Sequence, residues 1–513
     1  MGKPTINATL SGKAISAIAG RSILAVGTVA DTSSVVGNIV ENVQTLTETQ
    51  LDTYLGARSI LRKEVKKILD INRYVRTDVQ AIAQGYGAVG ATGKVTISGT
   101  ATADGSLEVY VVDKDYKASV TVTSADTAAE VATAIVAALL VSVYPTIPVS
   151  AEVDGNDAKF TALDEGIIGN DFSIKVVGAV AGLTLGITAF SGGTGTATYA
   201  VADLPERRYT GYAFPKHLYA SADNIESAID ARFNSTNATK DGVAFMGYDE
   251  SYSNIVSDFT DLNSKALVFA GNKLAPTTFP TANVLQEGSA IMTPADWRVA
   301  EFVAIRALRL TANAPISDYV FATNLDQVGG MKSASLPYFN TPLTESALTQ
   351  ANILFTETEK TGLQTIGFTV IDVNDAESGM IMGALVTPYK TDAKGSTDVT
   401  FKYLNYIDTG SVCREYIFNS LKNDLAQSRL TNGNLIPDVN IQNQASLEGL
   451  FMEYYAYLGK QALVSTGEDT QKVADSLVTV IDTANRQFTM TASIVLVTQI
   501  GTITMPITQV FSL

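Results

Sequence analysis

Apolar and polar residues follow two different periods along this chain, and the changes of period divide it into segments. Residues 22–29 form an apolar run that ends in turn residues, which predicts a strand. Residues 47–69 place apolar or tyrosine side chains three and four positions apart, which predicts helix. Gly56 falls inside this segment and predicts a break between two helices.

From about residue 90 to residue 200 the period shortens to two, and threonine, alanine, glycine and valine dominate. Val95 and Ile97 alternate with polar neighbours, and similar runs follow, so this segment predicts short strands. One helix interrupts them, because Thr127 and Glu130 form a capping box ahead of apolar positions spaced by four. The segment therefore predicts a β-rich domain that is inserted into the chain.

Strands and helices alternate between residues 201 and 393. Tyr252, Ile255 and Phe259 mark one helix face, and Pro294 favours the start of another helix. The predicted strands of this region are residues 243–247, 266–270, 319–322, 368–373 and 381–386. Alternation at this spacing predicts a mainly parallel sheet with helices on both faces.

The C-terminal part begins with two predicted helices, residues 411–429 and 445–463. The period then returns to two, since Phe488, Met490 and the next apolar positions alternate with threonine and serine, and a further apolar strand follows Gly501. An apolar β-segment with bare edges is prone to aggregation, so this segment predicts a partner strand.

The composition combines ordinary apolar content with little charge. The chain has 513 residues, long enough for several domains, of which 46% are hydrophobic and only 17% charged. The apolar content excludes disorder as the general state, and the scarcity of charge indicates surface that is buried against other subunits. Lys+Arg (36) minus Asp+Glu (52) gives a net charge of −16, which makes nucleic acid a poor candidate partner.

The sequence also bears on targeting. The N-terminus carries no basic region followed by a long apolar run, so we expect no cleaved signal peptide. The most apolar stretch, residues 132–144, is too short to span a bilayer and predicts a buried helix. We therefore expect no export by the usual route and no direct membrane insertion.

Candidate catalytic residues are scarce. His217 is the single histidine, and no nucleophile-elbow motif accompanies it, so a Ser–His–acid triad is not favoured. Cys413 is the single cysteine; it excludes an intrachain disulfide and lies on a predicted apolar helix face, which favours a core thiol. We expect no catalytic residue, no cofactor and no metal site.

Two short motifs resemble ligand sites but are better explained as connections. Residues 192–195 read Gly-Gly-Thr-Gly after a predicted strand, yet no Lys-Ser/Thr or helix signature follows, so a flexible linker is favoured over a phosphate cradle. Residues 154–165 mimic a calcium loop, but Ala158 and Lys159 stand where a ligand and a glycine are needed. A hairpin turn explains the same residues.

Three basic residues are spaced regularly on the predicted helix of residues 411–429. At about 100° per residue, Arg414, Lys422 and Arg429 fall within about 80° of one another, so they predict one basic stripe on an acidic protein. A solvated helix face explains such a stripe, and so does a docking surface for an acidic partner.

Four stretches carry a resemblance to a known family. They are residues 55–61, residues 93–105 followed by 126–132, residues 166–171 followed by 182–184 and 190–193, and residues 414–421. In this order they resemble the contractile-tail sheath proteins of tailed bacteriophages, particularly the Mu-like branch. One departure is Gly195-Thr196-Ala197-Thr198, because many relatives have Asn-Pro-Asp soon after the Gly-Gly pair.

The resemblance implies a fold class of α/β plus all-β in a multidomain chain. A central α/β sheath core carries an inserted β-rich domain that projects outward, and an α+β C-terminal domain lies against the tail tube, with strand-exchanging terminal arms. The implied segments are 1–45 (N-terminal linking arm and strand), 46–89 (first part of the core), 90–200 (inserted domain), 201–393 (core), 394–485 (C-terminal domain) and 486–513 (C-terminal linking strands).

The resemblance also implies a function. Sheath subunits form stacked hexameric rings around an inner tube, and their contraction drives the tube through the host envelope. The implied partners are other copies of the chain, the tail tube protein, and the baseplate and tail terminator proteins, in a virion assembled in the host cytoplasm. Arms of neighbouring subunits add strands to a subunit's C-terminal sheet, which is β-augmentation.

Two sets of site residues follow from the resemblance. We expect the basic stripe to contact the tube through Arg414, Lys422 and Arg429. The residues expected in inter-subunit strand exchange are Ile23, Leu24, Val26, Phe488, Met490, Ile494 and Leu496.

Two other classes of protein stay open. An α/β enzyme with a β accessory domain needs a convergent polar site, which one histidine and one cysteine make a poor prospect. A secreted surface-array or adhesin-like structural protein is favoured by the Thr/Ala/Gly-rich strands but needs an export route.

Overall fold

The computed structural model describes residues 22–29, 36–85, 87–233, 242–273, 294–311, 342–346, 354–373, 379–425, 428–435, 440–460, 463–483 and 487–496. The chain divides into two compact units. The larger unit comprises Arg21–Leu308 and Tyr338–Leu404, and the smaller unit comprises Met1–Gly20, Arg309–Pro337 and Asn405–Leu513. The predicted strands at residues 319–322 and after Gly501 lie outside the described residues.

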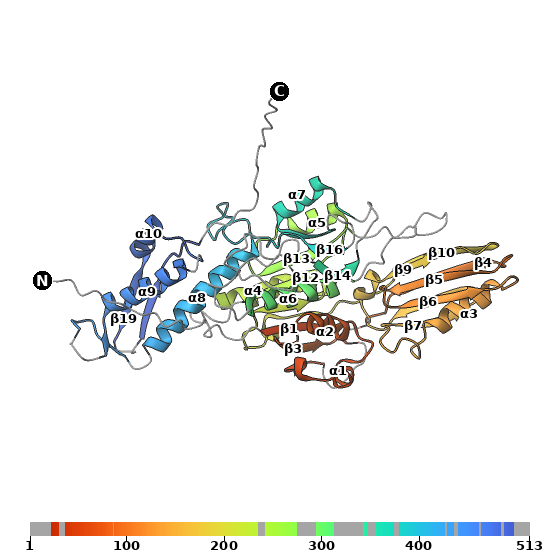
Figure 1. The fold of residues 1–513 in the computed structure, drawn as a ribbon, viewed down its shortest axis with the longest axis horizontal. Coiled ribbons are helices and arrows are strands. Elements are labelled where there is room, and N and C mark those ends of the chain that lie inside the picture. Colours follow the sequence, from red (N-terminus) through yellow and green to blue (C-terminus); the bar gives the residue numbers. More distant parts are fainter. Residues whose placement is uncertain are drawn as a thin grey trace, which may run out of the picture. The chain divides into compact units, whose positions relative to one another are not determined.

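A nine-stranded sheet forms the centre of the larger unit (Figure 1). In the order β14-β16-β15-β13-β12-β11-β1-β3-β2, the strands from β15 to β3 pair in parallel, whereas β14, β16 and β2 pair antiparallel at the two ends. The strands are β1 (Ser22–Thr28), β2 (Ile39–Val40), β3 (Arg76–Ile82), β11 (Gly211–Phe214), β12 (Val243–Gly247), β13 (Leu267–Gly271), β14 (Pro342–Ser346), β15 (Phe368–Val373) and β16 (Gly379–Met382). The predicted mainly parallel sheet is confirmed.

Helices cover both faces of this sheet. On one face, α4 (Ala222–Phe233), α5 (Tyr252–Phe259) and α7 (Glu357–Ile366) share an apolar cluster with the strands. On the other face, α2 (Ile60–Ile71) and α6 (Ala295–Thr311) approach closely. A Cβ at Gly211 of β11 would lie only 2.9 Å from Val303 of α6, so this approach requires glycine.

The break predicted at Gly56 is also confirmed. Helix α1 (Glu48–Leu55) begins at a capping box formed by Thr47 and Gln50, and Gly56 ends it with φ 74°. Ser59 then caps α2 by accepting a hydrogen bond from the backbone N–H of Arg62 at 3.1 Å.

Residues 92–191 form a β sandwich whose apolar core also includes Ile60 and Trp297. One sheet has the order β10-β4-β8-β7 and the other β6-β5-β9, and α3 (Ala128–Ala138) packs into the same apolar cluster. The capping box predicted at Thr127 and Glu130 is present. The strands are β4 (Thr92–Gly99), β5 (Gly105–Val112), β6 (Lys117–Val122), β7 (Val149–Asp154), β8 (Asp157–Ala162), β9 (Ser173–Val177) and β10 (Leu183–Ser191).

The two ligand-like motifs are connections in this structure. Asp154 pairs with Asp157 at the tip of the β7–β8 hairpin, and Gly155 takes φ 63°, so the predicted hairpin turn is confirmed. Thr194 forms an antiparallel bridge with Val89. The chain therefore enters and leaves the sandwich along adjacent segments.

The smaller unit combines helices with short sheets. Its helices are α8 (Leu404–Asp424), α9 (Gln444–Lys460) and α10 (Glu468–Ser476), and its strands are β17 (Arg429–Leu430), β18 (Ile441–Gln442), β19 (Val478–Asp482) and β20 (Gln487–Thr491). Apolar side chains of α8, α9 and α10 form one cluster, which includes Cys413 and Tyr455. The helix predicted at residues 445–463 is confirmed by α9, whereas β19 was not predicted, although its Val-Thr-Val-Ile sequence is typical of a strand.

Candidate inter-subunit surfaces

Strand β1 carries the first group of residues expected to exchange between subunits. It pairs in parallel with β3 along its whole length and with β11 at Ile23, Leu24 and Ala25, and all its residues are buried. The predicted strand is confirmed, and both of its edges are hydrogen-bonded within the chain. The exchanging role expected for Ile23, Leu24 and Val26 stays a prediction. Residues 1–21 lie outside the described residues.

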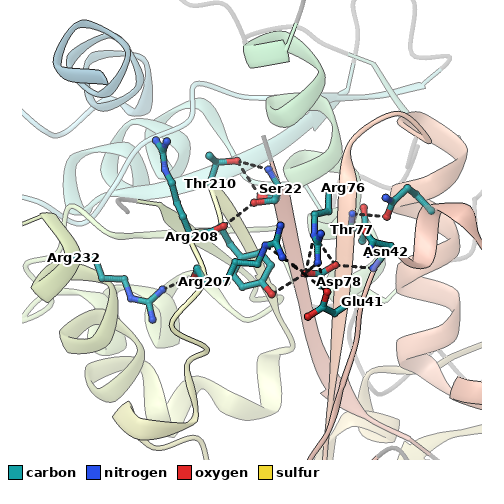
Figure 2. Close-up of polar contacts among 12 residues, drawn as sticks. Ser22, Glu41, Asn42, Arg76, Thr77, Asp78, Arg207, Arg208, Thr210 and Arg232 are labelled. Carbon is teal, nitrogen blue, oxygen red and sulfur yellow. Dashed lines mark hydrogen bonds and ion pairs between the residues drawn. The ribbon is translucent and has the colours of Figure 1, made fainter. Parts of the chain in front are cut away.

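Polar contacts fix the beginning of β1 (Figure 2). The Ser22 hydroxyl donates to the Arg208 carbonyl oxygen at 2.8 Å, and the Thr210 hydroxyl donates to the Ser22 carbonyl oxygen at 3.0 Å. These contacts tie the start of β1 to the segment that leads into β11, so the position where β1 begins is set by side chains as well as by the sheet.

A buried carboxylate joins the strands beside this point. Asp78 of β3 is fully buried and accepts hydrogen bonds from the Asn42 backbone N–H at 2.8 Å and from the Tyr209 hydroxyl at 2.9 Å. Arg76 Nε donates to the same carboxylate at 3.1 Å, and Arg76 also pairs with Glu41 at 2.6 Å. Burial, together with the Asp78 carboxylate, raises the pKa of Tyr209. This cluster was not predicted, because its only signal in the sequence is a pair of charged residues beside an apolar run.

The second group of expected exchange residues lies at the C-terminal sheet of the smaller unit. Strand β20 pairs antiparallel with β19, and among the described residues these two strands pair only with each other. Phe488 lies opposite Ile481, and Met490 opposite Thr479, on the half-buried or buried face. On the other face, Val480 is 60% exposed.

The observed strand β20 is shorter than the alternating pattern that predicted it. Strand β20 ends at Thr491, and extended pairing resumes only at Leu496, which bridges to Val464. Ile494 and Leu496 are partly buried against the apolar cluster of the smaller unit. Their side chains therefore contribute to the core of their own subunit, while the backbone edges of β19 and β20 have no further strand in the described part of the chain.

The basic stripe is only partly present. Arg414 is half-buried on α8 and Lys422 is exposed near the end of the same helix. Helix α8 ends at Asp424, however, and Arg429 lies in β17, where its N–H donates to the Asn440 carbonyl oxygen at 2.9 Å. The prediction of one helix face that carries all three residues is wrong for Arg429, because strand pairing holds its backbone outside the helix.

The two residues considered for catalysis are both buried. His217 lies in η4 (Lys216–Ser221), where loss of hydration lowers the pKa of its ring to about 4, and its two nitrogens have no hydrogen-bond partner among the described residues. Burial raises the pKa of the Cys413 thiol to about 12. A neutral, enclosed ring and a protonated thiol are unsuited to proton transfer or nucleophilic attack.

Within the described ranges, no group of three or more His, Cys, Asp or Glu side chains is placed to hold a metal ion. No helix of this part of the chain is both long and apolar enough to cross a membrane.

The class of protein defined by this fold is a mixed α/β protein with several sheets, whose candidate sites are surfaces and strand edges. The chain is 25% identical over 393 residues to the Mu-like prophage FluMu tail sheath protein of Haemophilus influenzae, a match that covers 75% of this chain and 71% of that relative. The resemblance to Mu-like tail sheath proteins is therefore confirmed.

No family model matches the chain. A sheath tail protein from Listeria innocua has a TM-score of 0.45 and 12% identity, with 93% of this chain and 92% of that chain covered. A chain of the anti-feeding prophage baseplate has a TM-score of 0.36 and 12% identity, with 59% and 69% covered. At these values the assignment rests on the Haemophilus relative.

Proposed function

We propose that this chain is a structural subunit of a contractile phage tail sheath. In this proposal it polymerises as stacked hexameric rings around an inner tail tube and shortens to drive the tube through the host envelope. The observation that carries the proposal is the similarity over 393 residues to a Mu-like prophage tail sheath protein. The low charge content supports it, since only 17% of residues are charged and a polymer subunit buries much of its surface against neighbours.

The β19–β20 sheet is the proposed acceptor of strands from neighbouring subunits. Its two strands pair only with each other in the described part, so each presents one backbone edge to which a further strand can add. In this proposal the terminal arms of neighbouring subunits supply the added strands. Hydrogen bonds of the main chain would then hold the sheath together independently of the side chains that repack when it shortens.

The exposed basic residues of the smaller unit are the proposed contact with the tube. Lys422 and Arg429 are both exposed, whereas Arg414 is half-buried and therefore less able to contact the tube directly. Each exposed ionic contact contributes at most about 1 kcal/mol and is weakened by salt, but the polymer repeats it in every subunit.

A charge-reversal variant tests the tube contact. Lys422→Glu with Arg429→Glu is expected to reduce co-sedimentation with tube protein at low salt, while the chain still assembles with itself. Lys460→Glu, a matched reversal at the exposed end of α9, should behave as wild type. Unchanged binding of the double variant to the tube would contradict the contact.

Negative-stain microscopy of the purified full chain tests the function as a whole. Helical tubes built of stacked rings are the expected result. Compact particles would favour an α/β enzyme, and flat lattices would favour a surface-array protein. For a virion tail component assembled in the host cytoplasm, co-expression with tube, baseplate and terminator proteins should give tails of uniform length.

A further inference from the structure

The β sandwich and the nine-stranded sheet, which belong to the same unit, meet at a joint rich in polar groups. Arg58, between α1 and α2, donates to the carbonyl oxygens of Ile147 at 2.8 Å and Val149 at 2.5 Å. Lys216 pairs with Asp171 of the sandwich at 3.0 Å. These contacts hold the sandwich on the sheet through hydrogen bonds as well as apolar packing.

One buried carboxyl group at this joint, that of Asp164, has an oxygen without a hydrogen-bond partner among the described residues. Asp164 follows β8 in the sandwich and is fully buried. Its Oδ2 accepts a hydrogen bond of 2.7 Å from the backbone N–H of Ile60, the first residue of α2. Its Oδ1 has no hydrogen-bond partner among the described residues. The Asp164 carboxyl thus joins the sandwich to a helix that packs on the nine-stranded sheet, and only one of its two oxygens accepts a hydrogen bond.

The basic side chains on and just before α2 interact with groups other than Asp164. Arg58 is bound to the two sandwich carbonyls described above, and Arg62 pairs with Asp52 of α1 at 2.8 Å. Lys63 Nζ lies 4.4 Å from the centre of the Tyr116 ring. The exposed Glu165 follows Asp164 in the chain.

The other carboxyl groups near the joint interact with partners of their own and not with Asp164. Asp296 accepts from the Lys216 backbone N–H at 2.8 Å, and the buried Glu64 lies within electrostatic range of Asp296. Asp171 pairs with Lys216, and Asp113 lies near Lys63. In the part of the chain that the structure describes, none of these cations pairs with Asp164.

We propose that Asp164 is a pH-sensitive contact between the β sandwich and α2, firm while its carboxyl group is neutral and weakened when that group ionises. Burial raises the pKa of Asp164 to about 7, against a smaller lowering by the hydrogen bond from Ile60. A neutral carboxyl can still accept that hydrogen bond, whereas an ionised one leaves a buried, unpaired charge on Oδ1.

The sign and size of the effect follow from proton linkage. A carboxyl whose pKa is higher in the docked state stabilises docking at acidic pH, and this stabilisation is lost as the pH rises through the raised value. Between the ordinary value of 3.8 and about 7, each pH unit changes the docking equilibrium tenfold. The full change is therefore about a thousandfold; it takes place between about pH 4 and pH 7 and levels off above the raised pKa.

The single tryptophan of the chain offers a direct probe of the joint. Trp297 of α6 is fully buried and belongs to the same apolar cluster as the core of the sandwich. Acrylamide quenching of its fluorescence therefore measures how open the joint is. We expect quenching of the wild-type chain to rise as the pH increases from about 4 to 7 and to level off above about pH 7.

Matched variants identify the group that titrates. Asp164→Asn keeps the oxygen that accepts from Ile60 but cannot ionise, so its quenching should stay low across the range. Glu165→Gln, an exposed neighbour, should keep the wild-type profile, and so should Asp296→Asn. A flat wild-type profile, or a transition that persists in Asp164→Asn and vanishes in Asp296→Asn, would overturn the proposal.

A second variant covers the case in which Asp164→Asn does not fold. Ile60→Pro removes the donating N–H at the first helical position, where proline is tolerated. Loss of that hydrogen bond should raise the pKa of Asp164 and so move the end of the quenching transition to higher pH, because the bond favours the ionised form. An unchanged profile would mean that another group controls the joint.

Discussion

Truncation of the N-terminus separates the folding of the subunit from its assembly. Residues 1–20 precede β1, whereas a deletion of residues 1–30 also removes β1 from the middle of the nine-stranded sheet. The two deletions therefore test different things. The shorter deletion should leave a folded subunit that no longer polymerises, and the longer one should prevent folding of the larger unit.

The size of the second effect can be worked from the burial of β1. Ile23, Leu24 and Val26 are each 0% exposed, and burying an apolar side chain of this kind contributes about 1.5–3 kcal/mol. Together they account for about 5–9 kcal/mol. Each backbone hydrogen bond that β1 shares with β3 and β11 adds about 1 kcal/mol. Since a whole domain is stable by about 5–15 kcal/mol, the loss removes most or all of that stability.

Circular dichroism with thermal melting, size-exclusion chromatography and negative-stain microscopy distinguish the two outcomes. The variant without residues 1–20 should melt as cooperatively as wild type and elute as a subunit without tubes. The variant without residues 1–30 should be insoluble or lack a cooperative transition. A folded, cooperative protein after the longer deletion would refute the central place of β1, and normal tubes after the shorter one would refute strand exchange by the N-terminal arm.

Three smaller predictions follow from single residues. Cys413 should react with iodoacetamide at pH 8 only after denaturation, because burial raises its pKa to about 12; rapid labelling of the native chain would contradict this. His217 has a pKa of about 4 in the fold against 6.5 when exposed, so unfolding free energy should fall by up to about 3 kcal/mol as the pH drops from 6.5 to 4. Urea titrations of His217→Asn should lack that loss. Thr127→Ala removes a capping box and should cost about 1 kcal/mol in the same assay, whereas Thr133→Ala, an exposed hydroxyl on the same helix, should cost less.

Local features of the fold could be predicted from the sequence because they depend on neighbours along the chain. The break at Gly56, the capping box at Thr127 and the hairpin before Asp157 each need only a few adjacent residues. The limits of α8 could not be predicted in this way. Residues up to Arg429 keep a helical spacing, but pairing of β17 with β18, a contact between distant segments, places Arg429 in a strand.

By itself the sequence determined the mixture of strands and helices, the β-rich character of residues 90–200 and the resemblance to Mu-like tail sheath proteins, because periodicity and motif order are properties of the chain alone. Only the tertiary structure decided that β1 is a central strand, since an apolar run is equally suited to the middle of a sheet or to a partner subunit. It also decided that Asp164 is buried against the start of α2, because burial depends on segments more than a hundred residues apart, and burial sets the pKa of a carboxyl group.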